Sequence, residues 1–337
     1  MNIAYSSIYN DFFGNDRLFD EKPCSLGQNL LSPFVKLKKE LEKLGHQIHT
    51  VDFYENFADV DFIIFQDLYY GYSATCDDFP AWLRYILKGK WRHDYLREAI
   101  KNLPLEKRIL IMMEPPIISP STYNQKHHKF FHKILTWNDD LVDEKKYFRL
   151  CYAQPVPDVK YNVPYDAKKF LTMVCGNKKS GAKNELYSKR KDVIEYCGKN
   201  KIQFDLYGYG WRKDTPCYCG SVDNKIETLS HYKYSVCYEN MTCINGYITE
   251  KIFDCFFAGC VPVYWGADNV TDYIPEEAFI DRRNFASNSE MISYLNGINE
   301  TEYEKYLSAA EKFIESQKFQ SEFSVDAFVQ RILEALE

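Results

Sequence analysis

The segment YKYSVCYENMTCINGYITEKIFDCFFAGCVPVYWG, residues 232–266, is the clearest indication of the fold of this chain. Residues 234–238 form an apolar run typical of a buried strand, and a polar loop follows them. Thr249 precedes an apolar helix that we expect to end at Gly259, and residues 261–265 form a second buried strand. Strand, helix and strand in this order predict a βαβ unit, in which ligands bind at the carboxyl ends of the strands. The charged residues after the first strand therefore lie where a ligand would bind.

The remaining sequence predicts two series of alternating strands and helices. In the N-terminal series the expected strands are residues 2–6, 47–53, 61–66 and 109–113. One expected helix begins at the cap Ser32-Pro33 and ends at Gly45, and its apolar face consists of Phe34, Leu37, Leu41 and Leu44. A second helix is expected at residues 95–101. In the C-terminal series we expect strands at 170–175 and 203–207 and a helix at 185–197. Apolar residues at helical spacing predict a last helix, namely Val325, Phe328, Val329, Ile332, Leu333 and Leu336. This alternation predicts an α/β fold with doubly wound sheets.

The length of the chain indicates two domains, because 337 residues exceed the usual size of one compact domain. Prolines at positions 155, 157 and 164 mark residues 154–164 as the linker. We therefore predict an N-terminal Rossmann-like domain over residues 1–154 and a C-terminal one over residues 165–320. The C-terminal helix, within residues 321–337, should dock on the domains.

The composition supports real cores and limits the possible partners. Hydrophobic residues make up 45% of the chain and aromatic residues 16%, which is too much for a disordered protein. A formal net charge of −6 argues against a general nucleic-acid binder. Between Ala167 and Lys191, however, the sequence contains eight Lys or Arg residues and a single acidic residue, Glu185, which gives a local net charge of +7. This run is either a solvated face or part of a site for an anionic ligand.

Four blocks of sequence stand in order around the βαβ unit: residues 238–240 (YEN), 246–251 (GYITEK), 258–263 (AGCVPV) and 273–275 (YIP). Together they resemble the donor-binding motif of the α-1,3/1,4-fucosyltransferases, glycosyltransferase family 10, and the similarity is strongest over residues 165–285. The resemblance implies a GT-B fold, with two Rossmann-like domains facing a cleft. It also implies an inverting enzyme that moves L-fucose from GDP-β-L-fucose to a glycan hydroxyl, with O-3 of GlcNAc and an α-1,3 linkage expected and α-1,4 left open.

Transfer from a sugar nucleotide requires that the charge of the departing diphosphate be neutralised. Lys251 lies in the first turn of the predicted helix, where free N–H groups and the helix dipole favour an anion. Arg190 aligns with an arginine that the family uses on the phosphates; the alternative is an ordinary surface arginine. Glu250 should stay ionised because the helix dipole and Lys251 favour its charge, and the resemblance implies that it contacts the donor.

Further residues complete the expected donor site. The resemblance adds Glu239, Asn240 and Tyr247 to the pocket, with Thr249 at the helix start. Tyr207-Gly208 and Gly176-Asn177 follow two other predicted strands. These four positions either lie along the nucleotide or simply form turns.

Glu114 is the candidate general base. It stands in Met113-Glu114-Pro115-Pro116, at the carboxyl end of an apolar strand, and the prolines stiffen the turn that aims it. The family has a glutamate followed by a small residue and proline, and that glutamate is its general base; Pro115 departs from this pattern. The alternative is a strand-end glutamate that only faces solvent.

No obligatory metal or other cofactor is predicted. The run GNKKSGAK, residues 176–183, has Ala182 where a phosphate-binding P-loop requires lysine. The cysteines near Cys217 lack the paired spacing of a zinc site. Two other functions stay open: a GT-B enzyme that uses a different sugar nucleotide, and a carbohydrate-binding relative without activity. The second is disfavoured because Glu114, Arg190, Glu250 and Lys251 are all present.

The expected partners are GDP-fucose and a GlcNAc-containing glycan, with no nucleic acid and no membrane span in this chain. No segment reaches the ~18 apolar residues that a membrane span requires. Eleven cysteines, an odd number, favour free thiols in a reducing compartment. A glycan on the sequon at Asn240 would occupy the expected donor site, which favours synthesis outside the secretory pathway. The sequence therefore suits a cytoplasmic protein or one peripheral at a membrane surface, and it leaves open a secretory-pathway form whose anchor has been removed.

Overall fold

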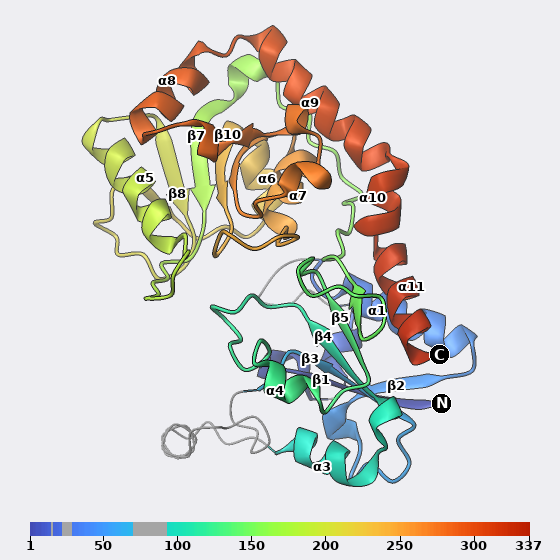
Figure 1. Cartoon of the computed structure of the whole chain (residues 1–337). Helices are drawn as coiled ribbons and strands as arrows, with labels where there is room; N and C mark the ends of the chain where they lie inside the picture. Colours follow the sequence, from blue (N-terminus) through green and yellow to red (C-terminus); the bar gives the residue numbers. More distant parts are fainter. Residues whose placement is uncertain (15, 22–28, 70–92) are drawn as a thin grey trace. The chain divides into compact units, whose positions relative to one another are not determined.

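The computed structural model describes residues 1–14, 16–21, 29–69 and 93–337 (Figure 1). The described chain divides into two compact units. Unit 1 consists of Met1–Pro155 together with Ser324–Glu337, and unit 2 consists of Val156–Phe323. The division thus falls inside the stretch of residues 154–164, and the chain returns to unit 1 with its last segment.

Unit 1 is built on a six-stranded parallel sheet with the strand order β2-β1-β3-β4-β5-β6. The strands are β1 (Asn2–Ser7), β2 (Gln47–Thr50), β3 (Phe62–Gln66), β4 (Arg108–Met112), β5 (Lys133–Thr136) and β6 (Tyr147–Arg149). Its α-helices are α1 (Ser32–Lys43), α3 (Tyr95–Asn102), α4 (Gln125–His128) and α11 (Val325–Leu336). The central strands β3 and β4 are buried along their whole length, as expected for strands covered on both faces of a parallel sheet.

The last helix, α11, packs within unit 1. Phe328, Val329 and Ile332 belong to the same buried cluster as Ile3 of β1. The ring of Phe328 meets that of Phe34 on α1 edge-on, with 5.7 Å between the ring centroids. The amphipathic pattern of the tail therefore marks a helix that completes the core of unit 1.

Unit 2 has a second six-stranded parallel sheet, in the order β12-β11-β10-β7-β8-β9. Its strands are β7 (Lys169–Val174), β8 (Phe204–Tyr207), β9 (Tyr218–Gly220), β10 (Tyr232–Tyr238), β11 (Val261–Trp265) and β12 (Ile280–Asp281). Its α-helices are α5 (Tyr187–Lys199), α6 (Lys225–Ser230), α7 (Glu250–Ala258), α8 (Asn288–Gly297), α9 (Glu300–Glu315) and α10 (Gln317–Glu322).

The predicted βαβ unit is present as β10, α7 and β11. The two strands are adjacent and parallel, and their register runs from Tyr234 opposite Val261 to Tyr238 opposite Trp265. Helix α7 ends at Gly259, whose φ of 63° is the left-handed conformation that glycine adopts without strain. The carboxyl ends of β10 and β11 therefore lie side by side, next to the start of α7.

Three details of the sequence prediction are wrong. Ser32 does not cap α1, because it is the first helical residue and its hydroxyl donates to the carbonyl of Asn29. Strand β2 stops at Thr50, and residues 51–53 form a 3₁₀ turn in place of the predicted strand. Leu44, predicted on the buried face of α1, follows the last turn of that helix and is 59% exposed.

Candidate functional site

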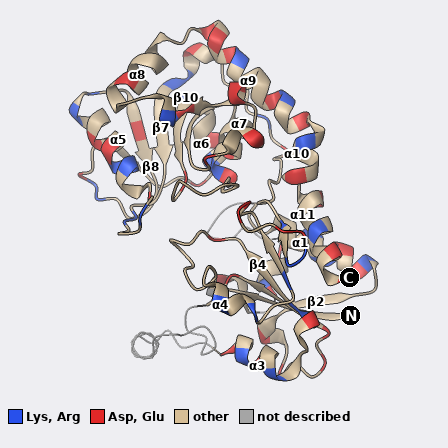
Figure 2. Cartoon of the chain, in the orientation of Figure 1, with Lys and Arg blue, Asp and Glu red and all other residues tan. Residues whose placement is uncertain are grey.

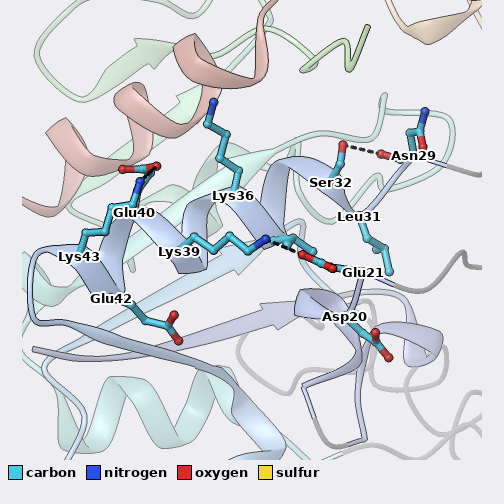
Figure 3. A pocket seen from close by; sticks show the side chains of 11 residues that line it. Asp20, Glu21, Asn29, Leu31, Ser32, Lys36, Lys39, Glu40, Glu42 and Lys43 are labelled. Atoms are coloured by element: carbon cyan, nitrogen blue, oxygen red, sulfur yellow. Dashed lines mark hydrogen bonds and ion pairs between the residues drawn. The ribbon is translucent and has the colours of Figure 1, made fainter. Parts of the chain in front are cut away.

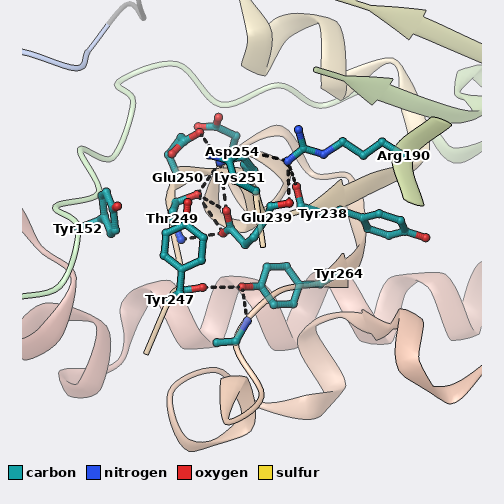
Figure 4. Close-up of polar contacts among 12 residues, drawn as sticks. Tyr152, Arg190, Tyr238, Glu239, Tyr247, Thr249, Glu250, Lys251, Asp254 and Tyr264 are labelled. Carbon is teal, nitrogen blue, oxygen red and sulfur yellow. Dashed lines mark hydrogen bonds and ion pairs between the residues drawn. The ribbon is translucent and has the colours of Figure 1, made fainter. Parts of the chain in front are cut away.

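A cluster of charged and polar side chains lies where β10 ends and α7 begins in unit 2 (Figure 4). At its centre is Glu239, which directly follows β10 and is fully buried. The hydroxyl oxygen of Thr249 lies 2.9 and 2.8 Å from the two carboxylate oxygens of Glu239, and the Thr249 N–H donates to Oε1 at 2.9 Å. The ammonium of Lys251 lies 3.1 Å from Oε2. One buried carboxylate therefore holds both the first residue before α7 and the cation in its first turn.

Helix α7 consequently starts on an anion that the protein itself supplies. The N–H of Thr249, the residue before the helix, is bonded to Glu239, so it is not one of the free N–H groups that we expect at this helix start. A carboxylate at this place satisfies a main-chain donor and interacts favourably with the helix dipole. An anionic ligand would therefore be bound through the cationic side chains of the cluster rather than through this N–H group.

Lys251 is a partly buried cation with two carboxylate neighbours. Its Nζ donates to Thr249 Oγ1 at 2.9 Å and lies 3.3 Å from Glu250 Oε1, and 22% of its side chain is exposed. Burial disfavours the charged form, but the carboxylates of Glu239 and Glu250 outweigh this effect and raise the pKa of Lys251 above its ordinary value. Lys251 is therefore charged and remains partly exposed to solvent.

Glu250 extends the cluster to two residues that the sequence analysis missed, Lys225 of α6 and Asp254 of α7. Lys225 Nζ lies 2.6 Å from Asp254 Oδ2 and 4.0 Å from Glu250 Oε1. Partial burial opposes ionisation of Glu250, whose side chain is 52% exposed, but Lys251 and Lys225 lower its pKa to about 2, so it stays ionised as predicted. Asp254 could have been found from the sequence, because a residue four positions after Glu250 lies on the same helix face.

Arg190 of α5 is an internal arginine, so the alternative of a surface arginine is wrong. Only 5% of the residue is exposed. One terminal nitrogen of its guanidinium lies 2.6 Å from the carbonyl oxygen of Tyr238, 2.7 Å from that of Glu239 and 3.2 Å from Asn240 Oδ1. Arg190 and Asn240 therefore hold the chain in place just where β10 ends.

Tyr247 and Gly266 pack around the same centre. Tyr247 is 1% exposed, and its carbonyl accepts a hydrogen bond of 3.2 Å from the hydroxyl of Tyr264. A Cβ atom on Gly266 would lie 2.3 Å from that hydroxyl and 2.5 Å from Cγ of Glu239. Only glycine fits directly after β11, because any side chain there would displace the buried carboxylate.

The structure does not bring the side chain of Tyr207 into the cluster. Its hydroxyl lies 2.9 Å from that of Tyr232, the first residue of β10, whereas Glu239 follows the other end of that strand. Asn177, after β7, donates from its N–H to Tyr209 O at 2.8 Å and from its side chain to Gly210 O at 3.0 Å. The contacts of Asn177 thus favour a turn over a ligand contact.

Gly176 lies in the same turn, and a Cβ there would have only an ordinary contact, 3.8 Å from Tyr209 O. Gly208 has a φ of 130°, and a Cβ there would lie 2.1 Å from the carbonyl oxygen of Cys175. Glycine at position 208 is therefore explained by close packing of the two loops.

The basic run between Ala167 and Lys191 is not a single anion site. Lys168 is buried and donates to the carbonyls of Ser230 and Gly259, at 2.9 and 2.6 Å, and Lys169 pairs with Asp205 at 2.8 Å. Figure 2 shows the basic residues of unit 2 distributed among several elements and interspersed with acids. The positive charge of the run is therefore divided between structural and exposed positions.

Glu114 in unit 1 follows β4 and is partly buried. Its carboxylate accepts a hydrogen bond from the hydroxyl of Tyr9, and its N–H donates to Asp67 Oδ2 at 2.9 Å. Asp67 follows β3, the strand next to β4. Glu114 could be predicted from its place at the end of an apolar strand, but no local sequence pattern connects Tyr9 and Asp67 to it.

A pocket of about 830 Å³ in unit 1 lies elsewhere, along α1 (Figure 3). None of the predicted site residues lines it. Four of its charged side chains form two ion pairs, Lys39 with Glu21 at 2.5 Å and Lys43 with Glu40 at 2.8 Å.

Neither a metal cluster nor a membrane span is found in the described part of the chain. Within those residues, no group of three or more His, Cys, Asp or Glu side chains is placed to hold a metal ion. None of the helices described is both long and apolar enough to cross a membrane.

The region that contains the cluster around Glu239 matches a known protein family. Residues 168–332 match the family model described as glycosyltransferase family 10 (fucosyltransferase), C-terminal. Over these residues, the chain belongs to glycosyltransferase family 10. This confirms the family that the sequence blocks around the βαβ unit indicate.

Curated relatives match a short part of the chain. The α-(1,3)-fucosyltransferase FucT of Helicobacter pylori is 40% identical over 75 residues, which is 22% of this chain and 16% of the relative. The α-(1,4)-fucosyltransferase of Arabidopsis thaliana is 39% identical over 72 residues, 21% of this chain and 18% of the relative. The matched region thus spans less than a fifth of either relative.

Solved structures extend the likeness to the fold of the whole chain. An α1,3-fucosyltransferase superposes with a TM-score of 0.56 at 15% identity, covering 99% of this chain and 89% of that one. An α-glucosyltransferase in complex with UDP also superposes with a TM-score of 0.56, at 10% identity and with both chains covered completely. At such identities the likeness concerns the fold alone. The predicted GT-B fold with two Rossmann-like units is confirmed.

The charge cluster predicts an unusual pH dependence of stability. Burial, together with Glu250 and against the opposing effect of Lys225, raises the pKa of Asp254 to about 6. A carboxyl group with a raised pKa in the folded state stabilises that state below its unfolded pKa, near 4, and this contribution is lost as the pH rises to about 6. The free energy of unfolding of the wild type should therefore decline between pH 4 and 6 relative to that of Asp254→Asn, as measured by urea unfolding. A constant difference between the two proteins over this range would contradict the assignment.

Proposed function

We propose that this protein is an inverting fucosyltransferase that moves L-fucose from GDP-β-L-fucose to a hydroxyl of a glycan acceptor. The observation that carries the proposal is the cluster of Glu239, Glu250 and Lys251 at the start of α7, inside the residues that match family 10. The proposed acceptor hydroxyl is O-3 of a GlcNAc residue, which gives an α-1,3 linkage. A solved α1,3-fucosyltransferase with the same fold was obtained with GDP-fucose, which supports this choice of donor.

Lys251 has the properties that a diphosphate ligand requires. It is charged, it pairs with Glu239 and Glu250, and 22% of its side chain is exposed. A cation in this setting can stabilise the negative charge that develops on the leaving diphosphate. Glu250, ionised and with 52% of its side chain exposed, is available to accept hydrogen bonds from donor hydroxyls. Arg190 supports this site from behind by fixing residues 238–240.

Glu114 is the proposed general base. In the reaction, the acceptor oxygen forms a bond to C1 of fucose while the bond from C1 to the GDP oxygen breaks, and the acceptor proton passes to the Glu114 carboxylate. The two electrons of the broken bond leave with GDP. A single displacement of this kind turns a β-linked donor into an α-linked product and requires no covalent intermediate on the protein.

A transferase of the same fold with another sugar nucleotide is the second candidate. The observation in its favour is the equal TM-score, 0.56, of the α-glucosyltransferase solved with UDP. The two candidates predict different effects of GDP and UDP on the melting temperature of the protein, because a ligand that binds the folded state raises the melting temperature. Stabilisation by GDP and not by UDP supports the fucosyltransferase, and the reverse result supports the second candidate.

Replacing Lys251 by alanine should weaken GDP binding. Loss of a charge-assisted hydrogen bond costs about 1.5–3 kcal/mol, which corresponds to a rise in Kd of roughly 10- to 150-fold. Stability should also fall, because Glu239 would be left as a buried carboxylate without its cation. Calorimetric titration with GDP, at a temperature at which the variant is folded, measures the effect. Lys189→Ala, an exposed lysine of the same unit, is the matched control, and equal affinities for the two variants would show that the phosphate site lies elsewhere.

Transfer should persist when divalent metal ions are removed. In the proposed mechanism, Lys251 provides the positive charge that a divalent ion provides in metal-dependent transferases. The measurement is fucose transfer to a GlcNAc-containing oligosaccharide in excess EDTA, with and without added Mn²⁺. Complete loss of transfer that Mn²⁺ restores would refute metal independence.

The variants Glu114→Gln and Glu250→Gln should distinguish the role of Glu114 as general base from the role of Glu250 as a residue that contacts the donor. Glutamine at 114 keeps the size of the side chain but accepts no proton, so turnover should fall by about 10²–10⁴-fold while GDP affinity stays near that of the wild type. Glutamine at 250 should lower donor affinity as well as turnover. Steady-state transfer and calorimetry on both variants measure the difference. Near-normal transfer by Glu114→Gln would exclude it as the base.

A further inference from the structure

We propose that Asp67 is a positioning residue for Glu114, which it holds in place through the main chain. The inference rests on the proposed role of Glu114 as general base. Asp67 Oδ2 accepts the N–H of Glu114 at 2.9 Å, and only 2% of Asp67 is exposed. The backbone N–H of the residue proposed to react therefore donates a partly buried hydrogen bond to the side chain that follows β3.

The peptide between Met113 and Glu114 is held from both sides. Its N–H donates to Asp67, while its carbonyl oxygen accepts hydrogen bonds from Trp137 Nε1 at 2.8 Å and from the hydroxyl of Tyr152. Pro115 follows and restricts the backbone further. Because Glu114 lies outside β4, these contacts take the place of the sheet hydrogen bonds that would otherwise orient it.

The backbone of Asp67 indicates that its position has a function. Its φ is 58°, in the left-handed region, which costs a residue other than glycine on the order of 1 kcal/mol. In this conformation its N–H still donates to the carbonyl of Ile111 on β4, at 2.8 Å, while its carboxyl group is directed to the Glu114 backbone. An unfavourable conformation that places a buried polar group on a proposed catalytic residue is typical of functional sites.

The charges of the pair are compatible with this role. Burial, and then the nearby charge of Glu114, raise the pKa of the Asp67 carboxyl well above its usual range. The hydrogen bond from the main chain of Glu114 acts in the opposite direction. Asp67 thus retains a proton more readily than an exposed aspartate does.

The test compares Asp67→Gly with Asp67→Asn. Both glycine and asparagine adopt positive φ, but only asparagine keeps an oxygen that can accept the Glu114 N–H. Asp67→Gly should lower kcat for fucose transfer to a GlcNAc-containing oligosaccharide by about 10- to 100-fold, with KM for GDP-fucose unchanged, because a small misplacement of a catalytic group is costly. Asp67→Asn should retain most of the wild-type kcat. Glu144→Gly, at an exposed residue of the same unit with a φ of 54°, is the matched control and should have no effect.

A double-mutant cycle distinguishes positioning from general damage to the fold. If Asp67 acts only through Glu114, Asp67→Gly should not lower the residual transfer of Glu114→Gln any further. An equal loss in both backgrounds, a normal kcat for Asp67→Gly, or a kcat for Asp67→Asn as low as that of Asp67→Gly would overturn the inference. If Asp67→Gly does not fold, Trp137→Phe applies the same cycle to the carbonyl side of the peptide, and an equal loss in both backgrounds again refutes positioning.

Failure of the proposed function gives a different result. Normal transfer by Glu114→Gln would remove the base assignment, whatever the Asp67 variants show. Loss of transfer in Glu114→Gln together with normal transfer in Asp67→Gly would keep the base and reject only the positioning role.

Discussion

The buried carboxylate of Glu239 is the interaction on which the arrangement of unit 2 depends. Its side chain joins the start of α7 to the end of β10 through Thr249, and its own N–H donates to Trp265 O at 2.8 Å at the end of β11. A charge this deep is tolerated only because hydrogen bonds and the ammonium of Lys251 compensate for the lost hydration. Lys251 is held in place because it compensates for the charge of Glu239. Position 266 requires glycine because a side chain there would displace the Glu239 carboxylate.

The cluster around Glu239 is an alternation of charges rather than a basic patch. Lys251 lies between the carboxylates of Glu239 and Glu250, and Lys225 lies between those of Glu250 and Asp254. Each cation is thus stabilised from two sides, which limits the movement of its side chain. A preorganised cation of this kind stabilises developing negative charge without first having to reorganise.

The two units use the same physical device at their proposed reactive residues. In unit 1, Asp67 follows a buried strand and accepts the N–H of Glu114; in unit 2, Glu239 follows a buried strand and accepts the N–H of Thr249. In each case a buried carboxyl group accepts a main-chain N–H close to an acidic residue that has access to solvent. In unit 1 the N–H belongs to the acidic residue itself, Glu114. In unit 2 it belongs to the residue before the acidic residue Glu250. Rigid support from residues behind the site is what a precise geometry requires.

The sequence alone was sufficient for the α/β class, the βαβ unit around α7, the helix end at Gly259 and the family of residues 168–332. These features depend on local periodicity, on glycine conformation and on a motif contiguous in sequence, all of which are visible along the chain. Only the tertiary structure could show that Arg190 is internal, that the side chain of Tyr207 is directed away from the cluster and that Lys168 is structural. It also showed that Lys225 lies close to Glu250 and that Asp67 accepts the N–H of Glu114. Their contacts join residues of α5, α6 and separate strands, and which groups are buried together depends on how the strands pair, which periodicity along the chain does not encode.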